Sequence, residues 1–475
     1  MRIIGNDPNT PRQTQVVASG TLSTGDTVVV NSDGTVSAIT ESGPSAGTPA
    51  VFETGTTYDT AAAYDASAQR VVVVYRDNGN SDYGTAVVGT VSGTSISFGT
   101  PVVILSSNSQ EFTISYDAGN EKVVVTLRDE GATNAGRAYV GTVSGTSISF
   151  GSQQNYESPA SQPSNVYVAD EGKTAVIFKD GSQRGAALVG TVGSVISFPQ
   201  APAIFHSAQT NDPTGVSVGS SKIVIAYVDA ADLDQGKALV ATVSGNTISY
   251  GSHVTFNTGS SSAISAAYDS TNDRVVIAYR DNGNSGYGTA VVGTVSGTSI
   301  SFGSEVVFNA ASTFWTTATF DTANNKIVVA CRDSGNDDGV AYVGTVSGTS
   351  ISFDSGTIYD TDSAYTNSAV FDSNTNQTII AYRDGGNSNR GTAVTFKAVD
   401  KNLTAENYIG TAKSGAADGD SVVVNTQGTV DTGQTGLTAG QSYYVQTDGT
   451  LSTTAGNPSV FAGTAVSSTK LIVKG

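Results

Sequence analysis

The chain is poor in the residues that usually build redox, metal and catalytic centres. Its 475 residues include one cysteine, one methionine, one tryptophan and two histidines. Cys331 has no partner for an intrachain disulfide, so stability cannot depend on oxidation, and we expect it to be a buried core thiol. Two histidines, His206 and His253, cannot populate a His-rich zinc or copper centre, and we expect both to be ordinary surface residues.

Basic charge is also scarce, since 23 Lys and Arg stand against 41 Asp and Glu and give a formal net charge of −18. Without a Lys/Arg cluster, this charge argues against a nucleic-acid partner. No apolar run reaches membrane-spanning length and the N-terminus lacks a signal-peptide core, so we expect synthesis in a cytoplasm and no membrane insertion. Nucleophile-elbow, Walker-type and dinucleotide-binding fingerprints are missing. The sequence therefore predicts no catalytic residue, no metal and no cofactor.

What the chain has in abundance is repetition. One phrase returns seven times, at its clearest as RVVVVYRDNGN (70–80) and RVVIAYRDNGN (274–284). The aspartates that close the phrase lie 49 to 52 residues apart and define repeats 1 to 7: Asp77, Asp129, Asp180, Asp229, Asp281, Asp333 and Asp384. Seven near-equal steps make accidental similarity implausible, so the period decides the architecture.

Each repeat contains four short segments rich in Val, Ile, Tyr and Thr, separated by Gly, Asn, Asp and Ser, which is typical of strands and turns. The run at Val71–Tyr75 is apolar at successive positions, so both faces of that strand should be covered. Four strands in a period of about fifty residues predict an all-β fold, a seven-bladed β-propeller over residues 45–400. The seventh repeat lacks its fourth strand, and the segment AGTPAVFETG (46–55) supplies a matching one, so we expect N- and C-terminal strands to close the last blade together.

The two flanks, residues 1–44 and 401–475, resemble each other. TGDTVVVNSDGTVS (24–37) matches DGDSVVVNTQGTVD (418–431) in cadence, and each is a strand, a turn and a second strand start. Because ring closure brings the chain ends together, we expect one small β docking domain formed from both flanks.

An Arg-Asp step begins a D-x-G-N turn in several repeats, for example at Asp77 and Asp281. The simplest role of the Asp is to cap the turn backbone, with the Arg paired across blades. Calcium binding is the alternative, because Asp and Asn oxygens suit Ca²⁺. The turn lacks the dense acidic spacing of calcium loops.

Departures from the repeat are more informative for function. Six residues before a recurrent Tyr-Asp or Phe-Asp landmark, repeat 1 has Tyr58, repeat 6 has Phe314 beside Trp315, and repeat 7 has Tyr365. These repeats are consecutive in a closed ring, so the four aromatics, placed in the connections between blades, form a candidate patch for sugar stacking or a protein partner. The alternative is that they fill gaps between blades.

Three stretches carry a family resemblance: NDPNTPRQTQVVASGTLSTGDTVVVNSDGTVS, VVGTVSGTSISFG and GLTAGQSYYVQTDGTLSTTAGNPSVFAGTAVSSTKLIVKG. Together they resemble virion structural proteins of tailed marine bacteriophages over essentially the whole chain. The resemblance implies a non-enzymatic tail-fibre or appendage component in the virion. Its implied partners are other virion proteins, further copies of itself and a host-surface glycan or receptor.

Three alternatives remain. A capsid decoration or head-fibre protein differs only in its place on the particle. A host-polysaccharide depolymerase would need a carboxylate pair in one repeat-specific loop. A carbohydrate-binding module would use the aromatic patch.

Overall fold

The structure is a computed structural model that describes residues 12–456 and 458–474. The chain divides into two compact units, residues 1–43 with 399–475 and residues 44–398. We call the first the terminal domain and the second the repeat domain. The first eleven residues of the predicted N-terminal flank lie outside the described residues.

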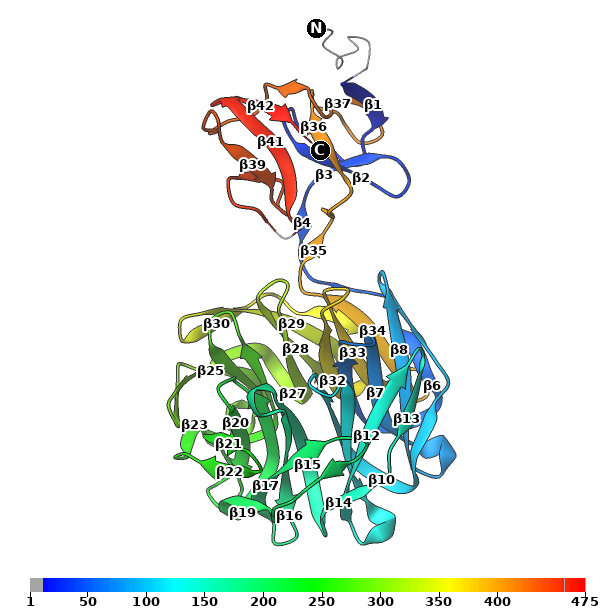
Figure 1. The fold of residues 1–475 in the computed structure, drawn as a ribbon, viewed down its shortest axis with the longest axis vertical. Helices are drawn as coiled ribbons and strands as arrows, with labels where there is room; N and C mark the ends of the chain where they lie inside the picture. The colour runs from blue at the N-terminus through cyan, green and yellow to red at the C-terminus, as the bar shows by residue number, and fades with distance from the viewer. Residues whose placement is uncertain (1–11, 457, 475) are drawn as a thin grey trace. The chain divides into compact units, whose positions relative to one another are not determined.

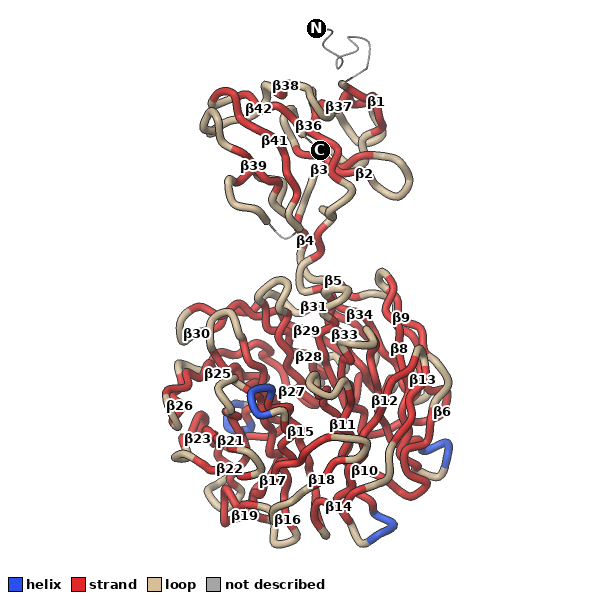
Figure 2. Tube along the Cα trace, viewed as in Figure 1, coloured by secondary structure: helices blue, strands red, loops and turns tan. Residues whose placement is uncertain are grey.

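Both domains are built from antiparallel strands, and the only helical elements in the described part of the chain are four short 3₁₀ turns (Figure 2). These turns are η1 (Asn78–Asn80), η2 (Glu130–Ala132), η3 (Ala169–Glu171) and η4 (Asn282–Asn284). The all-β prediction is therefore confirmed. In the terminal domain the strands are β1 (Gln13–Val17), β2 (Thr27–Val30), β3 (Val36–Ala38), β4 (Glu41–Ser42), β35 (Asp400–Lys401), β36 (Tyr408–Ala412), β37 (Ser421–Asn425), β38 (Val430–Asp431), β39 (Ser442–Val445), β40 (Leu451–Ser452), β41 (Val460–Ser467) and β42 (Lys470–Val473).

The repeat domain contains the remaining strands, which follow the sequence repeats. In repeats 1 to 3 and the segment before them these are β5 (Ser45–Ala46), β6 (Ala50–Asp65), β7 (Arg70–Asp77), β8 (Tyr83–Ser92), β9 (Ser95–Phe98), β10 (Val102–Asp117), β11 (Lys122–Asp129), β12 (Ala135–Ser144), β13 (Ser147–Phe150), β14 (Gln154–Glu157), β15 (Ala160–Val168), β16 (Lys173–Asp180), β17 (Arg184–Val192) and β18 (Ile196–Ser197). In repeats 4 to 7 they are β19 (Ala203–Ser217), β20 (Lys222–Asp229), β21 (Gln235–Ser244), β22 (Thr247–Tyr250), β23 (Val254–Asp269), β24 (Arg274–Asp281), β25 (Tyr287–Ser296), β26 (Ser299–Phe302), β27 (Val306–Asp321), β28 (Lys326–Asp333), β29 (Asp338–Ser347), β30 (Ser350–Phe353), β31 (Thr357–Asp360), β32 (Ala364–Asp372), β33 (Gln377–Asp384) and β34 (Arg390–Lys397).

The most apolar strand of each repeat lies between two partners. β7 pairs with β6 on one side and β8 on the other. All five residues of Val71–Tyr75 are 0% exposed. The prediction that both faces of this strand are covered is confirmed, and the same burial recurs in β24 and β28.

Long strands connect one repeat to the next. The first part of β6 pairs with β34, as at Ala50 opposite Ala393, and its last part pairs with β7, as at Asp65 opposite Arg70. Within the part that pairs with β7, the register shifts in a β-bulge after Tyr58. β10, β19, β23 and β27 are built in the same way. Each long strand therefore ends one sheet and begins the next.

Figure 1 shows the course of the repeat domain, with β34, from the end of the repeats, beside β6 and β7, from their beginning. β34 also pairs with β5, at Phe396 opposite Ala46. Strands from opposite ends of the repeat domain thus share one sheet.

The terminal domain contains two five-stranded sheets, ordered β1-β37-β36-β2-β3 and β38-β42-β41-β39-β40. In the first sheet β1 and β2 come from the N-terminal flank, and β36 and β37 come from the C-terminal flank. The hydrophobic core of the terminal domain contains residues of both flanks, including Val29, Tyr408 and Leu471. A docking role for this domain stays a prediction.

Candidate functional site

One cavity collects residues from all seven repeats. Its volume is about 660 Å³. One lining residue from each repeat, in order, is Thr60, Phe112, Gln162, Asp212, Ala263, Trp315 and Asn367. All seven lie near the bulge of a long strand or, in repeats 3 and 7, which lack a continuous long strand, near the start of β15 or β32. The cavity is therefore common to the whole repeat domain.

The bulge places one residue of every repeat in the left-handed backbone region. These residues, with their φ values, are Asp59 (51°), Glu111 (54°), Gln162 (52°), Asp212 (46°), Ala263 (51°), Trp315 (50°) and Thr366 (51°). Left-handed φ is uncommon for residues other than glycine. Its recurrence at equivalent positions shows that the bulge is a regular feature of every repeat.

In the first half of the repeats these bulge residues bind one another. The backbone N–H of Glu111 donates to Asp59 Oδ2 at 3.4 Å, and that of Gln162 donates to Glu111 Oε2 at 2.7 Å. Asp212 accepts from Gln162 Nε2 at 2.9 Å and from the N–H of Ala263 at 3.1 Å. Burial raises the pKa of both Asp59 and Glu111. The polar side chains therefore link each repeat to the next.

The chain of polar contacts changes character at repeats 5 and 6. Ala263 has no side-chain acceptor, and the next bulge position is occupied by Trp315. The rings of Trp315 and its neighbour Phe314 line the cavity there, 5.6 Å apart between centroids. The cavity thus has a polar side at Gln162 and Asp212 and an aromatic side in repeat 6.

The four predicted aromatics are close in space, and each is half-buried. Trp315 and Tyr365 meet edge to face, with centroids 4.9 Å apart. Tyr58, Phe314 and Trp315 lie within the long strands that connect one repeat to the next, and Tyr365 lies in β32. The connection itself is a paired strand, which satisfies its backbone hydrogen bonds.

Arginines cover the faces of these rings. Each guanidinium carbon lies within reach of a ring centroid for a cation–π contact: Arg280 over Phe314 at 3.9 Å, Arg332 over Tyr365 at 4.8 Å and Trp315 at 5.6 Å, Arg383 over Tyr365 at 4.2 Å and Tyr58 at 4.6 Å, and Arg76 over Tyr58 at 5.4 Å. We call these eight side chains the arginine–aromatic ladder. Tyr58 and Tyr365 each contact two guanidiniums, so they belong to the seams between repeats, whereas Phe314 and Trp315 also reach the cavity.

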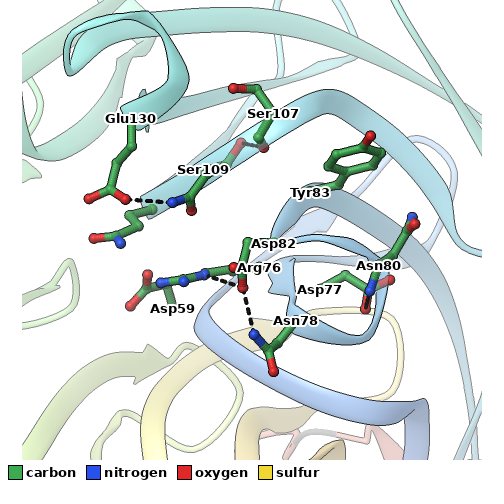
Figure 3. Close-up of polar contacts among 12 residues, drawn as sticks. Asp59, Arg76, Asp77, Asn78, Asn80, Asp82, Tyr83, Ser107, Ser109 and Glu130 are labelled. Carbon is green, nitrogen blue, oxygen red and sulfur yellow. Dashed lines mark hydrogen bonds and ion pairs between the residues drawn. The ribbon is translucent and has the colours of Figure 1, made fainter.

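Sequence analysis did not identify the acidic partners of the recurrent arginines. Figure 3 shows the arrangement in repeat 1, where Asp82 Oδ1 accepts from Arg76 Nε at 2.8 Å and from Asn78 Nδ2 at 2.8 Å. In repeat 2 Glu130 accepts from Arg128 at 3.1 Å. The signal was present in the sequence as an acidic residue a few positions beyond Arg76, Arg128 and Arg332.

The Asp of the repeated turn caps backbone N–H groups in repeats 1 and 7, as predicted, but Asp281 in repeat 5 makes no such cap and accepts from Asn257 Nδ2 at 3.2 Å. Asp77 accepts from the N–H of Asn80 at 3.1 Å, and Asp384 accepts from the N–H of Asn387 at 2.9 Å. Within the described residues, no three His, Cys, Asp or Glu side chains gather as metal ligands. The capping hydrogen bonds give Asp77 and Asp384 a structural role in the turn.

The histidine and cysteine expectations had different outcomes. His206 is not an ordinary surface residue, because its side chain is 15% exposed and its Nε2 lies 3.2 Å from Asp229 Oδ2. His253 is exposed, although its Nδ1 meets the Tyr227 hydroxyl at 2.7 Å. Cys331 is a buried free thiol as expected, and burial raises its pKa.

A second, smaller cavity of about 230 Å³ lies beside Asp360, Tyr382 and Asp384. Burial, together with the nearby charge of Asp384, raises the pKa of Asp360 to about 6. Folding therefore favours the protonated form of this carboxyl group.

Comparison with known proteins finds solved structures with a similar fold. No family model and no curated protein matches the chain. Among solved structures, it is similar to the BP39L lectin from Burkholderia pseudomallei, with 13% identity, a TM-score of 0.55, and coverage of 74% of this chain and 99% of the lectin. It is also similar to the NanB sialidase from Streptococcus pneumoniae (12% identity, TM-score 0.43, 73% and 70% coverage) and the Aleuria aurantia lectin (15%, 0.43, 64% and 97%). The likeness to the BP39L lectin shows a shared all-β, sheet-rich fold. Among the described residues, no helix is long and apolar enough to cross a membrane.

We predict measurable coupling within the arginine–aromatic ladder. In a double-mutant cycle, Tyr365→Leu and Arg383→Met should show a coupling free energy of about 0.5–2 kcal/mol in chemical unfolding, because each change removes the same cation–π contact. Tyr365→Leu combined with Arg128→Met, an arginine that does not contact Tyr365, is the control and should be additive within about 0.5 kcal/mol. Equal coupling in both cycles would argue against the ladder.

We predict that Asp360 makes stability depend on pH. Since its folded-state pKa of about 6 lies above the ordinary aspartate value of 3.8, the contribution of the protonated carboxyl group to stability is fully present below pH 3.8 and is lost as pH rises through about 6. Asp360→Asn should therefore raise the free energy of unfolding at pH 7 by roughly 1–3 kcal/mol and change it little near pH 3.5. The exposed Asp354→Asn is the control. A variant effect that is the same at both pH values would contradict this assignment.

Proposed function

We propose that the repeat domain is a seven-bladed β-propeller whose last blade is completed by the N-terminal strand. The pairing of β34 with β6 supports this, because it supplies a fourth strand to repeat 7. Contacts at the junction repeat those between other neighbours. Ser368 Oγ in repeat 7 accepts from the N–H of Ala62 in repeat 1 at 2.9 Å, and Ser265 accepts from Ala318 at 2.9 Å between repeats 5 and 6.

A close glycine contact supports the same closure. A Cβ added at Gly303 would lie 1.9 Å from the carbonyl oxygen of Thr349 in the following repeat. A Cβ at Gly47 would lie 2.2 Å from the carbonyl oxygen of Thr94 in repeat 1. Gly47 therefore meets repeat 1 as Gly303 meets repeat 6, which is the relation expected of an outer strand in the last blade.

We propose that the domain binds a glycan in the 660 Å³ cavity. The observation that carries this proposal is the combination of aromatic rings and polar groups around one space shared by all repeats. Phe314 and Trp315 offer apolar surface, while Gln162, Asp212 and Arg280 offer hydrogen-bond donors and acceptors. Saccharides present both kinds of surface, and ligand sites combine an aromatic lining with a few placed polar groups. The fold shared with a lectin is consistent with this function.

We further propose that the protein is a non-enzymatic virion component, in line with its resemblance to phage structural proteins. The propeller would face the host surface or a neighbouring subunit, and the terminal domain would dock to the particle. A capsid decoration or head-fibre role is the second candidate. The bulge carboxylates support a non-enzymatic role, because Asp59 and Glu111 already accept hydrogen bonds from the backbone of the next repeat.

We predict that Trp315→Ala weakens glycan binding. Alanine already occupies the equivalent bulge position in repeat 5, where Ala263 has a φ of 51°, so the backbone tolerates the change. After a glycan array identifies a binding saccharide, calorimetric titration should show at least about a tenfold loss of affinity, which is ~1.4 kcal/mol. Val307→Ala, on the same strand but outside the cavity lining, is the control.

Two outcomes would count against these assignments. A Trp315→Ala variant that binds like the parent would remove the cavity from the glycan site, and an array with no binding saccharide would remove the glycan function. Chromatography of the incubated saccharide tests the non-enzymatic part, since shorter products would contradict it.

The virion assignment predicts immunogold label on purified phage particles that carry this chain. Label at the tail tip, with saturable binding of the isolated protein to host cells, would support the appendage role. Label on the head or neck without cell binding would favour decoration instead. Particles that carry no label anywhere would contradict the virion proposal.

A further inference from the structure

Repeats 1 and 5 contain nearly the same nine-residue phrase. Repeat 1 has RDNGNSDYG (76–84) and repeat 5 has RDNGNSGYG (280–288), so the two differ only at Asp82 and Gly286. Each phrase begins with the recurrent arginine of the ladder. The single difference removes a carboxylate from the neighbourhood of Arg280.

The structure shows what that carboxylate does in repeat 1. Arg76 Nε donates to Asp82 Oδ1 at 2.8 Å, as Figure 3 shows, and this hydrogen bond raises the pKa of Arg76. Asn78 donates to the same oxygen. The charge of Arg76 is thus balanced within its own turn.

Arg280 has no such balance. Within residues 12–456 and 458–474, no hydrogen bond or ion pair joins the side chain of Arg280 to another residue, and its buried Nε has no partner. Asn282, the counterpart of Asn78, donates to Ser262 Oγ at 3.1 Å instead. Phe314 covers one face of the guanidinium at 3.9 Å, and a ring face cannot accept the in-plane N–H groups. A partly buried cation without an acceptor is unfavourable, and burial lowers its pKa.

Partners and position together set Arg280 apart from the other recurrent arginines. Arg332 is paired with Asp337, and Arg128 is paired with Glu111 and Glu130. Arg383 has Asn389 in place of the acid. Of the recurrent arginines, Arg280 is the one that lines the large cavity.

We infer that Arg280 recognises an anionic substituent, a carboxylate or a sulfate, on the glycan that occupies this cavity. This inference rests on the proposed glycan function and names the class of saccharide. A guanidinium forms charge-assisted hydrogen bonds with either group. Asp212, on the same cavity, accepts hydroxyl hydrogen bonds and repels a second anionic group. The cavity therefore fits a saccharide that carries one acidic group there.

Gly286 keeps this place open. A Cβ at Gly286 would lie 2.8 Å from Arg280 Nε, so any side chain there would displace the guanidinium or occupy its donor edge. Asp82 shows that an aspartate can adopt the required backbone, since its φ is 61° and that of Gly286 is 73°. Gly286→Asp should accordingly rebuild the internal ion pair of repeat 1.

The first test is an array of matched acidic and neutral saccharides. It holds tetragalacturonate and its methyl ester, sialyllactose and its methyl ester, and sulfolactose and lactose. We expect the parent protein to prefer the acidic member of a pair by at least about tenfold. Preference for a uronate or sialate identifies a carboxylate, and preference for sulfolactose identifies a sulfate. Equal binding of both members overturns this inference and leaves the glycan function standing, whereas no binding to any saccharide overturns both.

The second test uses the two-repeat comparison. Gly286→Asp should remove the preference for the acidic saccharide and leave binding of its neutral partner unchanged. Asp82→Gly, the reverse change in repeat 1, should alter neither, because Arg76 does not line the cavity. Should Gly286→Asp fold poorly, Arg280→Val replaces it, since repeat 4 has Val228 at the equivalent position. A preference that survives in a folded variant overturns the inference.

Discussion

Each long strand of the repeat domain pairs with two sheets, and a bulge follows directly after it enters the second. The first half of β6 completes the pairing of β34, while its second half begins the pairing with β7. Two residues after β6 begins to pair with β7, its register shifts, and the next residue takes a left-handed φ. Such a residue occurs once per repeat, and four of the seven line the large cavity: Gln162, Asp212, Ala263 and Trp315.

The backbone fixes these seven positions but leaves their side chains free to differ. In repeats 1 to 4 they are Asp, Glu, Gln and Asp, and they connect neighbouring repeats by hydrogen bonds. At repeats 5 and 6 they are Ala263 and Trp315, and the linkage gives way to an aromatic surface. The recurrent arginines differ in a similar way. Among the described residues, Arg76, Arg128 and Arg332 are paired with an acid of their own turn, whereas Arg280 and Arg383 are not, and of these two only Arg280 lines the cavity. Departures from the repeat, rather than the repeat itself, therefore define the candidate site.

Much of this fold could be predicted from the sequence, because strand, turn and repeat signals are local and periodic. The buried strand at Val71–Tyr75 and the capping role of Asp77 are examples. Features that depend on register between distant segments could not be predicted. The left-handed bulge has no sequence signature, since residues as different as Asp59 and Trp315 occupy it. For the same reason the guanidiniums that cover the four aromatics were missed. His206 was misplaced because its partner Asp229 lies on another strand.

The central claim is that the repeats together build one glycan site, and a crystal structure with the tightest-binding saccharide tests it most directly. The account predicts a sugar ring inside the cavity, against Phe314 or Trp315, with its acidic group within hydrogen-bond distance of the Arg280 guanidinium. A saccharide bound at saturation on the outer surface of the repeats or on the terminal domain, with the cavity free of it, would contradict the account.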